Sequence, residues 1–322
     1  MLLNHSRMVA SGLIGLLTLN PCIDKTIFVE SLPSHPGTID VQKVHLQAGG
    51  KGNNVARVLK RLGTASVSLN LVSGSTGEVV CDLLSAEGLT CDFFSSAGRT
   101  RTITTIVDKD YRQLVFKEPV HLPDTVKPSS ILKWVTEKLD QFSVLCINGS
   151  MPRSDFATFP QDLIQIAKQH QIPVLLDTSG SALLNGLKAG PTYCKPNIQE
   201  ISSVFSGSPV TLLSQLSSCG VQYPIITLNE QGAVYLYQNQ VIQIKPPAVQ
   251  TINSVGCGDS FIAGLLHASS HGADLPESIR FATACGAANA TSWEIAEFEN
   301  ETVSSLIPMV RESILCHSAV QE

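Results

Sequence analysis

The sequence carries no excess of positive charge. Its 322 residues hold 22 lysines and arginines against 27 aspartates and glutamates, which gives a formal net charge of -5. This balance argues against a broad nucleic-acid-binding or anionic-membrane-binding surface. It is compatible with a small anion-binding pocket, because a few well-placed cations can bind one phosphate group.

Long apolar runs and metal-ligand motifs are absent as well. No stretch reaches the roughly 18 to 20 apolar residues that a membrane-spanning helix needs. The nine cysteines contain no C-x-x-C motif, and none of the eight histidines has metal-ligand spacing with another. An odd number of cysteines without such a motif favours reduced thiols over disulfides or a zinc site. We therefore expect a soluble, cytoplasmic protein with no membrane anchor.

What the sequence does contain is a regular alternation of short apolar runs and helical periods. The run that ends at Leu19 leads directly into Asn20-Pro21, so we expect a short tail and a first buried strand rather than a leader peptide. The spacing of Val55, Val58, Leu59 and Leu62 predicts a helix that stops at Gly63. Further strands are expected at 65–72, 144–147, 174–176, near 193 and at 225–228, and further helices at 78–86, 131–139, 156–170, near 183 and at 210–218, 260–270 and 276–290. Repeated strand–helix alternation predicts an α/β protein with a mostly parallel sheet and helices on both faces.

Two segments interrupt this alternation. Residues 26–30 with 38–46, and 100–107 with 113–117, are pairs of strand-like pieces with no helix between them. They are typical of antiparallel ribbons outside the main sheet, which would form a small lid. With no repeat, low-complexity tract or linker in the chain, we expect a single domain over residues 1–322, with lid segments at about 24–47 and 98–118.

The sequence Gly256-Cys257-Gly258-Asp259 is the strongest functional signal. Glycines just before a helix let backbone amides converge, and the positive end of the helix dipole adds to them, so this segment can form an anion hole. A carboxylate at that point can accept the proton of an attacking hydroxyl group, which makes Asp259 a candidate catalytic base. The structural alternative is that Asp259 only caps the helix.

A second glycine motif, AGGKGNN over residues 48–54, opens the helix expected from about Val55. It is not a P-loop, because glycine rather than serine or threonine follows Lys51. Close backbone approach, a cation and two amides suit a polyhydroxylated or phosphorylated ligand. The alternative is a tight loop whose asparagine caps the helix.

Three other features are weaker. The spacing of Asn197 and Glu200 in KPNIQE suits a capping box, while the functional interpretation has both facing nucleotide phosphates, with Glu200 ordering hydrated Mg²⁺. Residues 227–233 have the pattern of an ordinary hairpin. Asp24 is interpreted as a loop carboxylate at a strand end, where ligands bind in sheets of this type.

Taken together and in this order, these residues resemble the ribokinase-like (PfkB) carbohydrate kinases, and within them the branch of 1-phosphofructokinases and tagatose-6-phosphate kinases. The stretches that carry the resemblance run from residue 18 to about 292: TLNPCID at 18–24, GGKGNNVAR at 49–57, GRTR at 98–101, NGSMP at 148–152, LDTSG at 176–180, KPN at 195–197 with Glu200, Thr227-Leu228 with Gly232, and residues 256–259. Each is weak alone, but eight in collinear order are specific.

The resemblance implies a doubly wound α/β domain with a small β lid, ATP as the phosphoryl donor, Mg²⁺ as the metal, and a small sugar phosphate as the partner. It also allows a homodimer through the lid. Asp259 would be the base, and the amides of Gly256, Cys257 and Gly258 the anion hole. The remaining roles fall to two groups of residues: a sugar site of Asp24, Gly49, Gly50, Lys51 and Asn53, where Lys51 and Arg101 hold the existing phosphate, and an ATP site of Lys195, Asn197, Glu200, Thr227, Asn229, Gly232 and Asn289, where Glu200 reaches the metal through water.

The sequence departs from this family pattern at three positions. Asn229 stands where the family usually has glycine, Cys257 replaces a common alanine or serine, and Thr102-Ile103 follows Arg101 where 1-phosphofructokinases tend to have x-Asn. We expect a kinase of fructose 1-phosphate or tagatose 6-phosphate, with fructose 6-phosphate also open. The alternatives are a catalytically silent sugar-phosphate sensor and a kinase of an unphosphorylated sugar or nucleoside.

Overall fold

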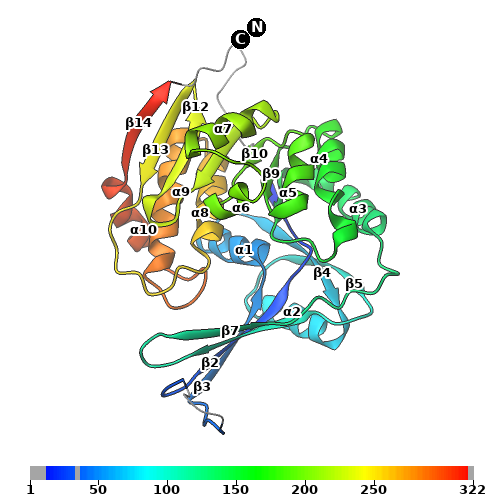
Figure 1. Cartoon of the computed structure of the whole chain (residues 1–322). Coiled ribbons are helices and arrows are strands. Elements are labelled where there is room, and N and C mark those ends of the chain that lie inside the picture. The colour runs from blue at the N-terminus through cyan, green and yellow to red at the C-terminus, as the bar shows by residue number, and fades with distance from the viewer. Residues whose placement is uncertain (1–11, 33–36, 318–322) are drawn as a thin grey trace.

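The computed structural model describes residues 12–32 and 37–317, which form a ten-stranded sheet and a separate four-stranded sheet (Figure 1). The predicted N-terminal tail lies outside the described residues. No helix within them is both long and apolar enough to cross a membrane.

The large sheet is mostly parallel, as the alternation predicts. Its strands lie in the order β14-β13-β12-β11-β10-β9-β8-β1-β4-β5, and neighbours are parallel from β11 to β5. The parallel strands are β1 (Leu13–Thr18), β4 (Ser66–Ser73), β5 (Cys91–Ser96), β8 (Phe142–Asn148), β9 (Val174–Asp177), β10 (Tyr193–Cys194) and β11 (Tyr223–Thr227). Three antiparallel strands extend one edge: β12 (Ala233–Tyr237), β13 (Gln240–Lys245) and β14 (Arg311–His317).

Helices cover both faces of this sheet, which explains why strands such as β9 are buried throughout (Figure 1). Alternate residues of β1 face different cores: Ile14 and Leu16 pack with one set of helices, and Leu17 with the other. The first set is α1 (Lys51–Arg61), α8 (Cys257–Ser270), α9 (Leu275–Ala290) and α10 (Asn300–Leu306). The second is α3 (Pro128–Thr136), α4 (Phe159–Gln169), α5 (Gly180–Lys188), α6 (Ile198–Ser202) and α7 (Pro209–Ser218). Helix α2 (Gly74–Ala86) packs in a smaller cluster with the base of the four-stranded sheet.

The four-stranded sheet contains the two predicted ribbons. Its order is β3-β2-β6-β7, with β2 (Cys22–Phe28), β3 (Lys43–Gly49), β6 (Arg101–Val107) and β7 (Gln113–Lys117). Each ribbon is antiparallel, and β2 joins them through parallel pairing with β6. Two expectations need correction, because residues 38–42 precede β3 and Asp24 lies inside β2 rather than in a loop. Asp24 is within the strand because β2 begins two residues earlier, at Cys22, which pairs with Gly49 on one side and Arg101 on the other.

Candidate functional site

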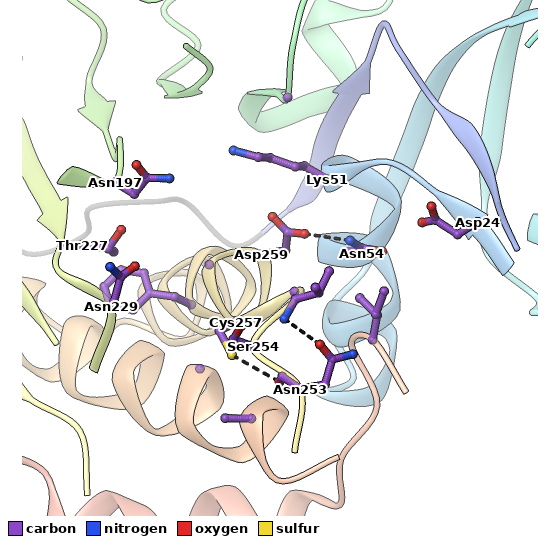
Figure 2. Close-up of a pocket in the computed structure, with 18 of the residues that line it drawn as sticks. Asp24, Lys51, Asn54, Asn197, Thr227, Asn229, Asn253, Ser254, Cys257 and Asp259 are labelled. Carbon is purple, nitrogen blue, oxygen red and sulfur yellow. Dashed lines mark hydrogen bonds between the residues drawn. The ribbon is translucent and has the colours of Figure 1, made fainter. Parts of the chain in front are cut away.

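A cavity of about 1200 Å³ lies between the four-stranded sheet and the main domain. Its lining includes Asp24 and Arg101 from the small sheet, Lys51 and Asp259 from the first turns of α1 and α8, and Asn229 from the β11–β12 connection. Figure 2 shows these elements converging, with Asp24 and Asn229 on opposite sides of Asp259. Residues from distant parts of the sequence therefore share one concave site, which is the usual form of a small-molecule site.

Helix α1 begins earlier than its apolar spacing indicates, at Lys51 rather than near Val55. Its N-cap is Gly50, which has φ 122° and no side-chain capping bond, so the prediction of an asparagine cap is wrong. A Cβ on Gly50 would approach Thr18 Cγ2 to 2.7 Å, so this position requires glycine for both backbone conformation and space. The early start places Lys51 and Asn54 one turn apart on the cavity side.

The structure does not bring the predicted Asn53 to the cavity but places the next residue, Asn54, there. Asn53 is fully buried: its Nδ2 donates to Gly49 O at 3.0 Å, and its Oδ1 accepts from Ser68 Oγ at 2.6 Å. Asn54 lines the cavity, and its Nδ2 donates to Asp259 Oδ2 at 2.7 Å. We therefore replace Asn53 with Asn54 as the candidate site residue. Gly49 is also outside the lining, and a Cβ there would overlap the Asp24 carboxylate.

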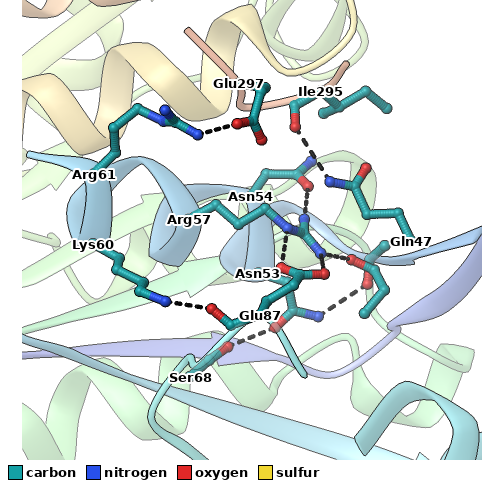
Figure 3. A network of polar contacts seen from close by, with 12 residues as sticks. Gln47, Asn53, Asn54, Arg57, Lys60, Arg61, Ser68, Glu87, Ile295 and Glu297 are labelled. Atoms are coloured by element: carbon teal, nitrogen blue, oxygen red, sulfur yellow. Dashed lines mark hydrogen bonds and ion pairs between the residues drawn. The ribbon is translucent and has the colours of Figure 1, made fainter. Parts of the chain in front are cut away.

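Arg57, which is outside the cavity lining, holds Asn54 in this orientation (Figure 3). Its Nη1 donates to Asn54 Oδ1 at 2.8 Å, and Glu87 pairs with its guanidinium. The Asn54 amide group must therefore present its NH₂ to Asp259, because its oxygen is occupied by a donor. Sequence reasoning gave Asn54 no role of its own, because the resemblance pointed to Asn53.

Asp259 lies in the first turn of α8 and does not cap it. The N-cap is Gly256 in the left-handed conformation, with φ 84° and no side-chain capping bond, so the structural alternative for Asp259 is wrong. The side chain of Asp259 is buried at 7% exposure. Burial raises the pKa of Asp259 to about 6, although the nearby Lys51 ammonium opposes the shift. Such a carboxyl group changes charge close to neutral pH, as a general base should.

Asp177 at the end of β9 joins two of the predicted cationic residues. Its Oδ2 lies 3.1 Å from Lys51 Nζ, and its Oδ1 lies 3.1 Å from Lys195 Nζ. Burial alone would raise the pKa of Asp177, but the two ammonium groups outweigh it and hold the pKa below its usual value. Burial likewise opposes the charge of Lys51, yet the carboxylates around it raise the pKa of Lys51. Sequence reasoning assigned no role to Asp177, although it stands in a strand-end motif.

Polar side chains form a row across four neighbouring parallel strands, at the carboxyl ends of β1, β8 and β9 and within β4. Thr18 is in register with Asn70 on one side and Asn148 on the other, and Asn148 is in register with Asp177. All four are buried, and Thr18 and Asn148 line the cavity. Thr18 Oγ1 and both amide atoms of Asn148 have no hydrogen-bond partner among the described residues, so they are available to a ligand or to water.

Asn197 and Glu200 form the capping box that their spacing predicts. The Glu200 amide donates to Asn197 Oδ1 at 2.8 Å, and the Asn197 amide donates to Glu200 Oε2 at 2.9 Å. Both residues also line the cavity, and the other carboxylate oxygen of Glu200 accepts from Lys51 Nζ at 3.1 Å. The capping and ligand-facing interpretations are therefore compatible, because Glu200 uses a different oxygen for each.

The β11–β12 connection has the predicted hairpin form. Thr227, Asn229 and Gly232 line the cavity, and Asn229 has φ 54° where the resembling family usually has glycine. Asparagine adopts this left-handed conformation more readily than most residues, so the backbone path is kept. Gly232, with φ 87°, is closely packed, and a Cβ there would overlap Ile244 O.

Asn289 is buried away from the cavity lining, contrary to its predicted place beside the adenine. Its Nδ2 donates to Val255 O at 2.8 Å, and its Oδ1 accepts from the Ala296 amide at 2.8 Å. These bonds hold the segment before α8 instead. Ala287 and Ala290, on the same helix, line the cavity at this point, so small side chains form the wall that was assigned to Asn289.

The small sheet contributes a carboxylate and cations of its own. Burial raises the pKa of Asp24, whose Oδ1 accepts a long hydrogen bond from the Cys22 thiol at 3.4 Å. Arg101 Nη2 donates to Asn20 O at 3.5 Å, while its buried Nε has no partner among the described residues. Lys117 lines the same wall from β7, the strand next to the β6 strand of Arg101, and it is in register with Ile103 of β6. No motif in the sequence singles out Lys117.

No group of three or more histidines, cysteines, aspartates or glutamates within residues 12–32 and 37–317 is arranged to hold a metal ion directly. The cavity still suits Mg²⁺, which keeps several waters and commonly takes only one or two carboxylates beside the phosphates of a nucleotide. Glu200, on the wall with Asn197 and Thr227, fits that pattern.

Comparison with known proteins agrees with this arrangement. The profile of the pfkB family carbohydrate kinases matches residues 17–300. The chain is 30% identical over 307 residues to 1-phosphofructokinase of Bacillus subtilis, covering 93% of this chain and 99% of that protein. It is 29% identical over 299 residues to 1-phosphofructokinase of Borreliella burgdorferi, covering 89% and 95%.

Solved structures share the fold at lower identity. Phosphofructokinase-2 from Escherichia coli in complex with fructose-6-phosphate superposes with a TM-score of 0.81 at 23% identity, over 93% of this chain and 99% of that one. Ribokinase from Thermotoga maritima gives 0.72 at 17% identity, over 92% and 99%.

Proposed function

Because the chain belongs to the pfkB family of carbohydrate kinases, we propose that it transfers the γ-phosphate of ATP to a hydroxyl group of a ketohexose phosphate. The candidate acceptors are fructose 1-phosphate, tagatose 6-phosphate and fructose 6-phosphate. The observation that carries the proposal is Asp259: a buried carboxyl group with a pKa raised to about 6, at the start of α8 and between two walls with different polar groups.

In this reaction Asp259 accepts the proton of the attacking hydroxyl group. The Asn54 amide at 2.7 Å orients one carboxylate oxygen and leaves the other for the substrate. Amides of residues 256–258 at the positive end of α8 stabilise the charge on the transferred phosphoryl group. Asp259 and the anion hole thus act at the two atoms between which the new bond forms.

Lys51 supports the transfer from the main-domain side. Figure 2 shows its side chain pointing away from Asp24, and its Nζ lies between Asp177 and Glu200. We therefore assign Lys51 to the transferred phosphate rather than to the phosphate already on the sugar. Its ammonium is held in place before any ligand binds, which is the arrangement that stabilises a transition state most effectively.

The nucleotide and Mg²⁺ occupy the wall formed by Lys195, Asn197, Glu200, Thr227, Asn229 and Gly232. Members of this family take ATP as the phosphoryl donor and typically need Mg²⁺. The metal supplies charge neutralisation between the β- and γ-phosphates. The residues of the chain would bind and orient the polyphosphate, and Glu200 would hold the hydrated metal ion.

The phosphate of the acceptor is held by Arg101 together with Lys117. A dianionic phosphate needs more than one cation, and Arg101 offers a planar fork whose Nε has no partner among the described residues. Lys117 adds a second charge from β7, the strand paired with β6, on which Arg101 lies. Binding there places the charged end of the sugar on the small sheet, which would act as a lid and exclude water when closed.

The outer face of the small sheet suits contact with a second copy of the chain. Val44, Ile27, Ile106 and Leu114 are aligned across the four strands, and Leu46 and Phe116 lie in the next row. Val44 is 48% exposed and Phe116 is 56% exposed, an unusual state for large apolar side chains that lie together. We propose a symmetric homodimer through this face.

Two experiments test these proposals. A coupled ADP-release assay should show turnover with at least one ketohexose phosphate, loss of turnover with EDTA, and recovery with Mg²⁺. No turnover with any of the three acceptors, despite measurable binding, would favour a silent sensor. For the dimer, Phe116→Glu should give a monomer by light scattering, whereas Leu184→Glu, at an exposed leucine of α5, should leave the mass unchanged.

A further inference from the structure

An aromatic cluster joins the small sheet to the loop that follows α9. The ring of Trp293 lies 5.5 Å from that of Phe28, the last residue of β2, with the planes 61° apart. It also lies 5.8 Å from the ring of Tyr111, in the turn between β6 and β7. One indole ring therefore contacts both ribbons of the small sheet. Beside it, Gln47 Nε2 donates to Ile295 O at 3.4 Å, which adds a polar link between the same two parts (Figure 3).

The two ring contacts of Trp293 lie at the far end of the small sheet. The near end is already fixed, because β2 follows β1 after a short connection and β3 leads directly into α1. Phe28 is the last residue of β2, Tyr111 lies in the turn that follows β6, and Trp293 lines the cavity. The sheet is therefore held at both ends, and Trp293 forms the contact that must open if the sheet moves.

The loop of Trp293 is bonded in turn to the segment that precedes α8. Asn253 Nδ2 donates to Trp293 O at 2.9 Å, and Asn253 Oδ1 accepts from the Val255 amide at 3.0 Å. Asn289 binds the same segment through Val255 O and binds the loop through the Ala296 amide. Figure 2 shows Asn253 beside Cys257, at the point where the helix begins. A displacement of Trp293 would therefore be transmitted to the backbone on which the anion hole is built.

We infer that Trp293 is a positioning residue that couples the position of the small sheet to the start of α8. When the indole is seated between Phe28 and Tyr111, the small sheet is closed over the cavity and residues 253–256 are held for phosphoryl transfer. If one ligand stabilises the closed sheet, it raises the affinity for the second ligand. The second ligand then raises the affinity for the first by the same factor. The inference rests on the proposed function only in naming those ligands as a ketohexose phosphate and ATP.

Hydrogen exchange tests the coupling without any ligand. Trp293→Ala should raise amide exchange in two separate places, the strands of the small sheet and residues 253–258, by about tenfold for the loss of two ring contacts. Trp134→Ala is the matched control. Trp134, the other tryptophan, lies on α3, and its ring packs 5.8 Å from the ring of Phe94, away from both segments. Trp293→Phe should restore much of the protection. Exchange that rises only in the Trp293 loop, or in neither segment, would overturn the inference.

Kinetics then separates this inference from the proposed function. In wild type, saturating acceptor should strengthen binding of a non-hydrolysable ATP analogue, and Trp293→Ala should abolish that effect and lower kcat about tenfold. A Trp134→Phe protein leaves Trp293 as the sole tryptophan, and its emission should shift when the acceptor binds. Raised exchange in both segments with no turnover in wild type would remove the kinase proposal and keep the coupling. Full turnover with unchanged binding cooperativity in Trp293→Ala would keep the kinase proposal and remove the coupling.

Discussion

The two walls of the cavity carry cations in different states. On the main-domain wall, Lys51 and Lys195 are paired with Asp177, which is fully buried, and Lys51 also contacts Glu200. On the small-sheet wall, Arg101 and Lys117 form no ion pair with any residue in the described part of the chain. Fixed cations suit charge that develops at the same point in every turnover, whereas unpaired cations suit a ligand that brings its own charge. We therefore propose that catalysis belongs to the main-domain wall and acceptor recognition to the small-sheet wall.

The largest expected effect comes from removing the base at the main-domain wall. Asp259→Asn keeps the shape and the Asn54 contact but cannot accept a proton, so kcat should fall by about 10²- to 10⁴-fold with little change in melting temperature. Near-normal turnover would mean that Asp259 is not the base.

Arg101→Ala should break the recognition wall selectively. We expect a loss on the order of 2 to 4 kcal/mol in transition-state binding for the phosphorylated sugar, roughly 30- to 1000-fold in kcat/KM. The parent ketohexose should be a poor substrate in both proteins and should barely respond to the change. Equal impairment on both sugars would remove Arg101 from the phosphate site.

Lys117→Ala tests whether the second cation belongs to the same site. The KM for the sugar phosphate should rise about tenfold, less than for Arg101, because a partly solvated point charge gives a weaker contact than a bidentate fork. Lys25→Ala is the matched control, since Lys25 lies in the same sheet but outside the residues that line the cavity. Identical changes in both variants would indicate a general charge effect.

The pH dependence of kcat/KM should report Asp259. The carboxyl group must be ionised to act, and its pKa is raised to about 6, so activity should fall about tenfold for each unit below that value and level off above it. Lys51→Met removes a cation that favours the ionised form of Asp259. The acidic limb should therefore move to higher pH in this variant. The range from pH 5 to 7 covers about one unit on either side of this pKa. A flat profile of kcat/KM over that range would contradict the raised pKa of Asp259.

The smallest effect is expected at the hairpin that faces the nucleotide. Asn229→Gly should lower the KM for ATP a few-fold and leave that for the sugar unchanged, because glycine adopts φ 54° freely. If both constants rise, or the protein loses stability, Asn229 has a structural role that glycine cannot fill.

The sequence predicts the frame of this molecule better than its details. Apolar periodicity located six of the seven parallel strands because they are buried, but it missed β5, whose residues are only partly buried or exposed. It also placed the start of α1 near Val55, since the polar first turn has no apolar period. The choice of Asn53 rather than Asn54 came from the family resemblance and not from the helix pattern. Asp177 escaped notice because its partners stand at positions 51 and 195, and no local pattern joins them. β14 was missed for a similar reason, because it pairs with β13 across some 65 residues that include two long helices.

Asp177 also has a consequence for how the chain folds. It is buried at the end of a central strand, and the two charges that compensate it arrive from α1 and from the residue after β10. An unpaired ionised carboxylate at that depth would be costly, so Asp177 is stable in its charged form only when both lysines are in place. The packing of α1 and of the segment after β10 around this strand end therefore also brings together the cations of the main-domain wall. At this point the closure of the core and the electrostatics of the site depend on the same ion pairs.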